Sequence, residues 1–121
     1  MRVILAAAAL SLSFTANADF VHPLDFDGSE AQKQEVLDYI VSRVKADYCD
    51  SELDMCQESN LRMMEKSNLK AFKQLTQATN RKILDKVIED YCSSELDMCS
   101  YTNLDMMYKS NLKASGEKLE W

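Results

Sequence analysis

The sequence has 121 residues, of which 46% are hydrophobic and 28% are charged, and it contains two Gly, one Pro and four Cys. So few Gly and Pro residues cannot supply the turns of a many-stranded β-sandwich or barrel, and the composition also excludes collagenous and low-complexity chains, so we expect an all-α fold. The formal net charge of −6 argues against nucleic-acid binding, because that binding depends on Lys and Arg neutralising phosphates, and it also disfavours an anionic membrane surface.

Residues 1–18 have the pattern of a cleavable secretory signal peptide. Arg2 precedes an apolar stretch over residues 3–14, and Ala16 and Ala18 supply the small residues of an A-x-A cleavage site. The apolar stretch is shorter than the roughly 18 residues that a membrane-spanning helix needs. We therefore expect an exported protein, periplasmic or extracellular, without membrane insertion, that begins at Asp19 after cleavage.

Residues 19–28 contain the only Pro and the only His and have no helical pattern. We therefore expect an extended segment before the first helix, which we call the lead-in. We expect His22 to be exposed there, and a single His cannot build a His-based catalytic or metal cluster. A capping-box pattern of Ser29 and Gln32 then predicts the start of the first helix. The apolar residues expected on its core face are Leu37, Ile40, Val41, Val44 and Tyr48.

The rest of the chain contains an internal repeat. Residues 48–72 and 91–115 are identical at 18 of 25 positions after a shift of 43 residues, and the apolar helix before each segment is duplicated at the same offset. Each unit predicts a helix, a Cys-containing connector and a second helix. We expect two tandem disulfide-stapled helical hairpins, unit 1 (residues 29–78) and unit 2 (residues 79–121), that form a small four-helix array or bundle.

The second helix of each unit has a polar residue within its apolar stripe. With Asn60 as the expected N-cap, Asn68 lies between Met64 and Phe72 in unit 1, and Asn111 has the same place in unit 2. Either the helix breaks at this Asn, or the Asn is held in the seam between helices, where it fixes their register. We favour a continuous helix.

The cysteines form two pairs with six intervening residues, Cys49 with Cys56 and Cys92 with Cys99, and predict disulfides in a short exported chain. Residues seven apart on an unbroken helix are about 10.5 Å apart, too far for a disulfide. The Ser-Glu-Leu-Asp segment after the first Cys of each unit predicts a turn and a new helix start. We predict one disulfide within each unit; the alternative is crosswise pairing of Cys49 with Cys99 and of Cys56 with Cys92.

Six methionines follow the repeat and are the one candidate metal signal. Thioethers bind Cu(I), but Met is also a gap-filling core residue, and no His ligand accompanies these residues. The favoured function therefore has no cofactor and a Cu(I) carrier is the alternative, with Met63 expected to point away from the apolar stripe. The six residues are Met55, Met63, Met64, Met98, Met106 and Met107.

The two units differ at positions expected on the surface, and unit 2 has Tyr101 and Tyr108 where unit 1 has Glu58 and Glu65. Tyr is enriched in protein interfaces and Glu is depleted, so we expect these two tyrosines to form an interaction surface. The sequence thus predicts a small acidic module without enzymatic activity that binds a protein partner or associates with itself. A thiol-disulfide exchange protein is less favoured, because catalytic pairs use the Cys-x-x-Cys spacing.

Overall fold

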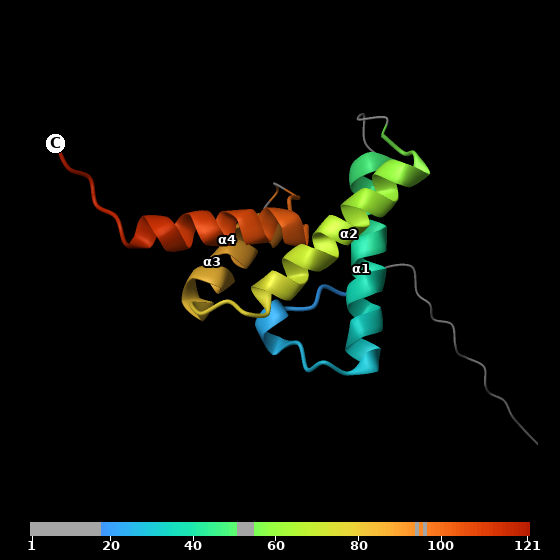
Figure 1. Ribbon diagram of the computed structural model, residues 1–121, viewed down its shortest axis with the longest axis horizontal. Coiled ribbons are helices and arrows are strands. Elements are labelled where there is room, and N and C mark those ends of the chain that lie inside the picture. The colour runs from blue at the N-terminus through green and yellow to red at the C-terminus, as the bar shows by residue number, and fades with distance from the viewer. Residues whose placement is uncertain (1–17, 51–54, 94, 96) are drawn as a thin grey trace, which may run out of the picture.

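The computed structural model describes residues 18–50, 55–93, 95 and 97–121 (Figure 1). The elements in these residues are all helical: η2 (Pro23–Asp25), α1 (Glu30–Tyr48), α2 (Glu58–Leu75), α3 (Arg81–Cys92) and α4 (Tyr101–Ser115). The predicted all-α fold of two helical hairpins is confirmed. None of the helices in the described part of the chain combines the length and apolar character that crossing a membrane requires. The predicted signal peptide lies outside the described residues except for Ala18.

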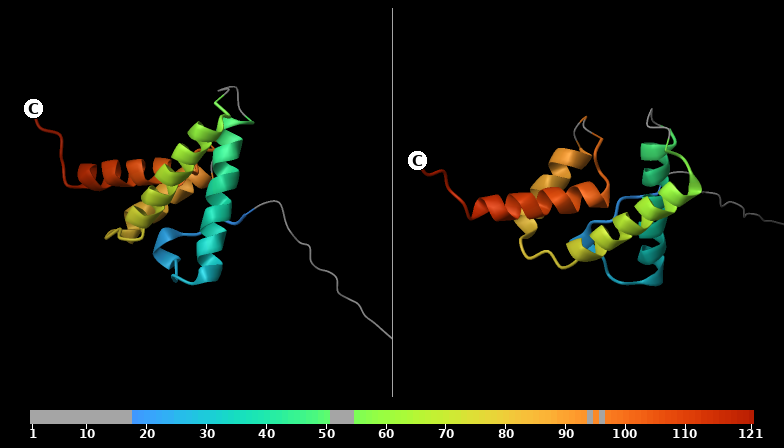
Figure 2. Two further views of the ribbon diagram at one scale, coloured as in Figure 1. Left: turned by 45° about the vertical axis from the view of Figure 1, so that its right-hand side comes forward. Right: turned by 45° about the horizontal axis from the view of Figure 1, so that its top comes forward.

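The α2 helix is the centre of the array. It contacts α1 within unit 1, it contacts α4 of unit 2, and α3 packs on the other side of α4. Two further views show α2 running between α1 and α4 (Figure 2). The two hairpins are therefore joined through their second helices, so that neither unit has to bury its apolar face alone.

Local capping signals place three of the helix starts. The Ser29 side chain accepts a hydrogen bond from the backbone N–H of Gln32 at 3.1 Å, as predicted, and Asn80 caps α3 through the N–H of Ile83 at 3.1 Å. Ser100 caps α4. The α2 helix begins at Glu58 instead of after Asn60, and its N-cap Gln57 makes no side-chain capping bond.

Each unit contains its own disulfide, as predicted. Cys49 bonds to Cys56 and Cys92 to Cys99, with Cα atoms 4.6 Å apart in both pairs. In both connectors a backbone N–H just before the second Cys donates to the carbonyl of the last Tyr of the preceding helix, at 3.3 Å in unit 1 and 3.2 Å in unit 2. Crosswise pairing is therefore excluded. The helix starts predicted after the first Cys of each unit fall on residues 51–54 and 94–97, of which 51–54, 94 and 96 lie outside the described residues. In unit 2 the described residues 97–100 are not helical, and α4 begins at Tyr101.

The core face of α1 is rotated from the predicted one. Val36, Ile40 and Val44 are buried, whereas Leu37 is 41% exposed and Val41 is 49% exposed. The reason is a contact with unit 2: the Tyr39 hydroxyl donates to the carbonyl of Cys99, and Arg43 forms an ion pair with Asp97 at 3.0 Å. These two contacts turn one flank of α1 towards unit 2. The opposite flank, which carries Leu37 and Val41, then faces outward.

The lead-in is part of the core instead of a simple extended segment. Val21 and Pro23 are buried, and Pro23 begins the 3₁₀ turn η2. The ring of Phe20 stacks on Tyr101 with centroids 5.4 Å apart, and Phe26 meets Phe72 edge-on at 5.1 Å. These contacts connect the start of the described chain with both units.

Both second helices are continuous, as favoured. Asn68 is 3% exposed and lies in the seam between α2 and α4, where its side chain donates to the carbonyl of Met64 at 2.9 Å and accepts from the N–H of Thr102 at 3.2 Å. The equivalent Asn111 is exposed and donates to the carbonyl of Met107 at 3.0 Å. The same residue therefore joins the two units in one copy and faces solvent in the other.

Candidate functional site

The two tyrosines expected at an interaction surface lie inside the molecule. Tyr101 is 0% exposed and Tyr108 is 5% exposed. The Tyr101 hydroxyl donates to the carbonyl of Val21 at 2.8 Å and accepts from its N–H at 3.1 Å, and burial raises the pKa of this phenol. The Tyr108 hydroxyl accepts from the N–H groups of Thr79 and Asn80, both at 3.1 Å.

The expectation that these tyrosines are exposed is thus wrong, and the reason lies in the surroundings of α4. Tyr101 is covered by the lead-in and Tyr108 by the connection between the units, so both serve an interface within the chain. At the equivalent positions of unit 1 the carboxylates pair with one Arg instead: Glu58 is exposed and pairs with Arg62 at 3.1 Å, and the half-buried Glu65 pairs with the same Arg at 2.9 Å.

Four of the six repeated methionines are exposed. Met63 is 56% exposed, which confirms that it points away from the apolar stripe, and Met106 is 58% exposed. Met55 and Met98 are 41% and 39% exposed, while Met64 and Met107 pack against the core. The exposed four lie in two different connectors and two different helices. In the part of the chain that the structure describes, no group of three or more His, Cys, Asp or Glu side chains could hold a metal ion.

The cysteine sulfur atoms and the single imidazole stabilise the fold. All four cysteines are in disulfides. His22 is not a free exposed residue as expected: its Nδ1 accepts from the N–H of Leu24 at 3.1 Å, and its Nε2 lies 2.6 Å from Oδ1 of Asp85 on α3. Since both ring nitrogens have partners, His22 fixes the lead-in to α3.

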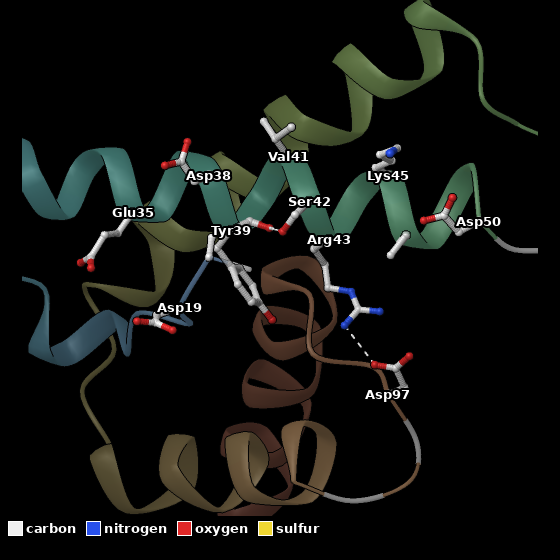
Figure 3. Close-up of a pocket in the computed structure, with 12 residues that line it drawn as sticks. Asp19, Glu35, Asp38, Tyr39, Val41, Ser42, Arg43, Lys45, Asp50 and Asp97 are labelled. Carbon is white, nitrogen blue, oxygen red and sulfur yellow. Dashed lines mark hydrogen bonds and ion pairs between the residues drawn. The ribbon is translucent and has the colours of Figure 1, made fainter. Parts of the chain in front are cut away.

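An open groove lies along α1 (Figure 3). It has a volume of about 1060 Å³ and lies between α1, residues 18–19 and Asp97; we call it the α1 groove. Tyr39 and Arg43 point from α1 across it towards unit 2, and Asp50 lies at the far end of α1 (Figure 3). Exposed Val41 adds an apolar wall.

Negative charge dominates the α1 groove. Two cations face five carboxylates, which are those of Asp19, Glu35, Asp38, Asp50 and Asp97. One of the cations, Arg43, is already paired: burial alone would lower its pKa, but the hydrogen bonds that it donates to Asp97 and Asp47 outweigh burial and raise the pKa. Lys45 is the other cation. In the described part of the chain Glu35, Asp38 and Asp50 form no ion pair, so a surplus of negative charge is available to a ligand.

The sequence prediction missed this site, because it assigned Leu37 and Val41 to the core. One available signal was the width of the apolar stripe on α1, in which Leu37 and Val41 lie beside Val36, Ile40 and Val44. An apolar surplus of this kind between acidic residues indicates an exposed apolar strip.

Comparisons of the chain with protein-family models, with curated proteins and with solved structures gave no match. The function of the α1 groove is therefore inferred from its own residues.

Proposed function

We propose that this chain is an exported, non-enzymatic binding module whose α1 groove binds a basic, partly apolar segment of a partner protein. The observation that carries the proposal is the composition of the groove, in which Glu35, Asp38 and Asp50 form no ion pair with described residues and the side chain of Val41 is exposed. A segment with Lys or Arg on either side of an aliphatic residue complements both features. Charge complementarity of this kind supplies specificity and a fast encounter with the partner.

Export is supported by the two disulfides and by the sequence pattern of residues 1–18. Disulfides persist in oxidising compartments and are rare in the cytosol, so the chain needs such a compartment to keep its bridges. We expect the mature protein to begin at Asp19. The mass of the intact protein recovered from its native compartment tests this: a mass that includes residues 1–18 would contradict export by this signal.

A non-enzymatic role is supported because the His22 imidazole and the cysteine sulfur atoms already have partners within the chain. An acid-base residue needs a free lone pair or proton directed at a substrate, whereas the ring nitrogens of His22 are both bonded within the chain. A nucleophilic or exchanging thiol needs a free sulfur, and the cysteines are oxidised.

Titration of the ¹⁵N-labelled protein with a peptide probe tests the binding proposal. The probe is a short helical peptide with Lys and Leu along one face, and the comparison peptide has Glu in place of each Lys. We expect the basic peptide to shift the amide signals of α1 around Glu35, Asp38 and Val41, and the acidic peptide to leave them unchanged. The shifts should shrink as salt is added, because salt screens exposed charges.

A pair of variants localises the effect. Glu35→Gln with Asp38→Asn should weaken binding of the basic peptide severalfold. Glu117→Gln with Glu120→Gln removes the same charge from the exposed end of the chain and should leave binding near the wild-type level. Equal weakening by both double variants would mean that only net charge matters, and would overturn the groove as the binding site.

Cu(I) binding remains a second candidate, and the exposure of four methionines favours it. Thioethers exposed at 39–58% are available as ligands for a soft cation. The test is an anaerobic Cu(I) titration of the oxidised protein in competition with a chromophoric chelator, repeated with Met63→Leu and Met106→Leu together. Failure of the wild-type protein to compete for Cu(I) would reject this candidate, and it would not affect the α1 groove.

A further inference from the structure

A second charged surface lies on α2 and has the opposite sign. Lys66, Lys70 and Lys73 recur at intervals of four and three residues, which places them on one face of the helix, and they surround the half-buried Leu69. Together they line a shallow depression of about 440 Å³; we call these four residues the α2 lysine face. The sequence contains no Asp or Glu from Lys66 to Leu84, although the chain as a whole is acidic.

The two surfaces each carry charge that the molecule leaves unneutralised. In the part of the chain that the structure describes, none of the three lysines forms an ion pair, although Lys33, Lys86 and Lys109 do. The carboxylates of the α1 groove present the matching surplus. No residue lines both the groove and the depression on α2, so one molecule can use both surfaces at the same time.

We propose that the α1 groove of one molecule binds the α2 lysine face of a second copy of this chain. The inference rests on the proposed function, because it assigns a partner to the same groove. The lysine face runs from Lys66 to Lys73, about 10 Å along the axis of α2, and the groove follows α1 from Glu35 to Ala46, about 16 Å. The lysine face therefore fits within the length of the groove.

The apolar parts of the two surfaces also match. Leu69 lies among the lysines, and on α1 the exposed Val41 follows the exposed Leu37 by one turn, on the same side of the helix as Asp38 (Figure 3). Lysine stems are themselves apolar and cover such side chains while their ammonium groups reach the carboxylates. Since the contact joins two different surfaces, each added copy presents a free groove or a free lysine face, and association continues beyond a dimer or closes into a ring.

Sedimentation velocity of the purified, oxidised chain tests the proposal. At low salt we expect the weight-average sedimentation coefficient to rise with protein concentration, and at high salt we expect the monomer, because exposed charges are screened. The double variant Glu35→Lys with Asp38→Lys reverses the charge of these two groove positions. The triple variant Lys66→Glu with Lys70→Glu and Lys73→Glu reverses the charge of the lysine face. Each variant alone should remain monomeric at low salt.

Mixing the two charge-reversed variants gives the decisive observation. The reversed groove of one is complementary to the reversed lysine face of the other, so an equimolar mixture should associate at low salt although neither variant does so alone. The matched control for the lysine-face variant is Lys82→Glu with Lys113→Glu and Lys118→Glu, which makes the same change in net charge at other exposed positions. We expect this control to associate less than the wild-type chain but more than the lysine-face variant. Helical content by circular dichroism verifies that each variant folds.

The outcomes separate this inference from the proposed function. A wild-type chain that stays monomeric at low salt while its groove binds the basic peptide would overturn the second copy as the partner and leave the groove to another protein. A chain that neither associates nor binds the peptide would overturn both. Variants that associate as the wild-type chain does, or a mixture that stays monomeric, would also contradict the proposed contact.

Discussion

The side chain of Asn68 on α2 accepts a hydrogen bond from the backbone N–H of Thr102 on α4 at 3.2 Å. Thr102 is in the first turn of α4, where backbone N–H groups have no carbonyl partner within the helix. A side chain of unit 1 thus satisfies an orphan donor of unit 2. Because Asn68 is 3% exposed, water cannot readily replace it, and the bond fixes how the two hairpins are aligned.

We expect Asn68→Ala to lower the free energy of unfolding by about 1–2 kcal/mol, because it leaves a partly buried N–H group of α4 without its acceptor. Urea denaturation of the oxidised protein, followed by circular dichroism, measures the change. The repeat supplies a matched control in Asn111→Ala, since Asn111 is exposed and bonds only within its own helix. That variant should stay within about 0.5 kcal/mol of the wild-type protein. Equal losses for the two variants would contradict a role for Asn68 between the units.

Features set by neighbouring residues could be predicted from the sequence. The N-cap at Ser29 and the disulfides within each unit depend on residues a few positions apart. Spacing and capping chemistry are sufficient for such features. The continuous α2 helix through Asn68 was also predicted, although the sequence could not identify the partner of that residue.

Features set by distant contacts could not be predicted. The orientation of α1 depends on Tyr39 and Arg43 meeting the connector of unit 2, more than fifty residues away in the sequence. Tyr101 is buried only because Phe20 and Val21 of the lead-in pack over it. Apolar periodicity on α1 fits two stripes that differ by one residue, and the sequence alone does not decide which stripe faces inward. The candidate site was missed for the same reason.

Tyr101 should make the protein sensitive to alkali. Burial raises the pKa of its phenol above the ordinary value near 10, so the unfolded chain loses this proton at a lower pH than the folded chain. The stabilising contribution is fully present below about pH 10 and is lost as the pH rises through the raised value. Burial also raises the pKa of Tyr39, so this residue accounts for part of the stability that is lost at alkaline pH.

We expect Tyr101→Phe to lower stability at neutral pH by about 1–2 kcal/mol, because the N–H and carbonyl of Val21 lose their partner. The variant should also lose less stability than the wild-type protein between neutral and strongly alkaline pH. Rapid urea denaturation at a series of pH values, before the disulfides degrade, measures both effects. If the two proteins lose the same free energy of unfolding at alkaline pH, the Tyr101 phenol is not the cause of the loss.

The two disulfides should contribute unequally. Each closes a loop of the same length, for which chain entropy alone predicts about 2–3 kcal/mol. Cys99 is 8% exposed and its carbonyl accepts from Tyr39, whereas Cys56 is exposed. We expect Cys92→Ser with Cys99→Ser to cost more than Cys49→Ser with Cys56→Ser, because the first change also disturbs the contact between α1 and unit 2. Thermal unfolding of the two variants compares them, and a larger loss from the unit 1 pair would contradict this account.

The bond between His22 and Asp85 should hold the lead-in on α3 in a pH-dependent way. The hydrogen bond from His22 lowers the pKa of Asp85, with Arg81 acting in the same direction. A lowered pKa of the folded carboxyl gives a stabilising contribution that is present above the ordinary aspartate value of about 4 and is lost as the pH falls through the lowered value. The lead-in should therefore open more often in acid.

The exchange rate of the Val21 amide reports on this opening, since its N–H donates to Tyr101 only while the lead-in is docked. At neutral pH we expect Asp85→Asn to raise that rate severalfold, with a partial effect because Arg81 still binds Asp25 at 2.8 Å. Asp90→Asn is the matched control: Asp90 lies on the same helix and pairs with Lys86 of α3, so its loss leaves the lead-in contacts intact. If both variants raise the exchange rate equally, the effect comes from α3 itself and not from the contact of Asp85 with His22.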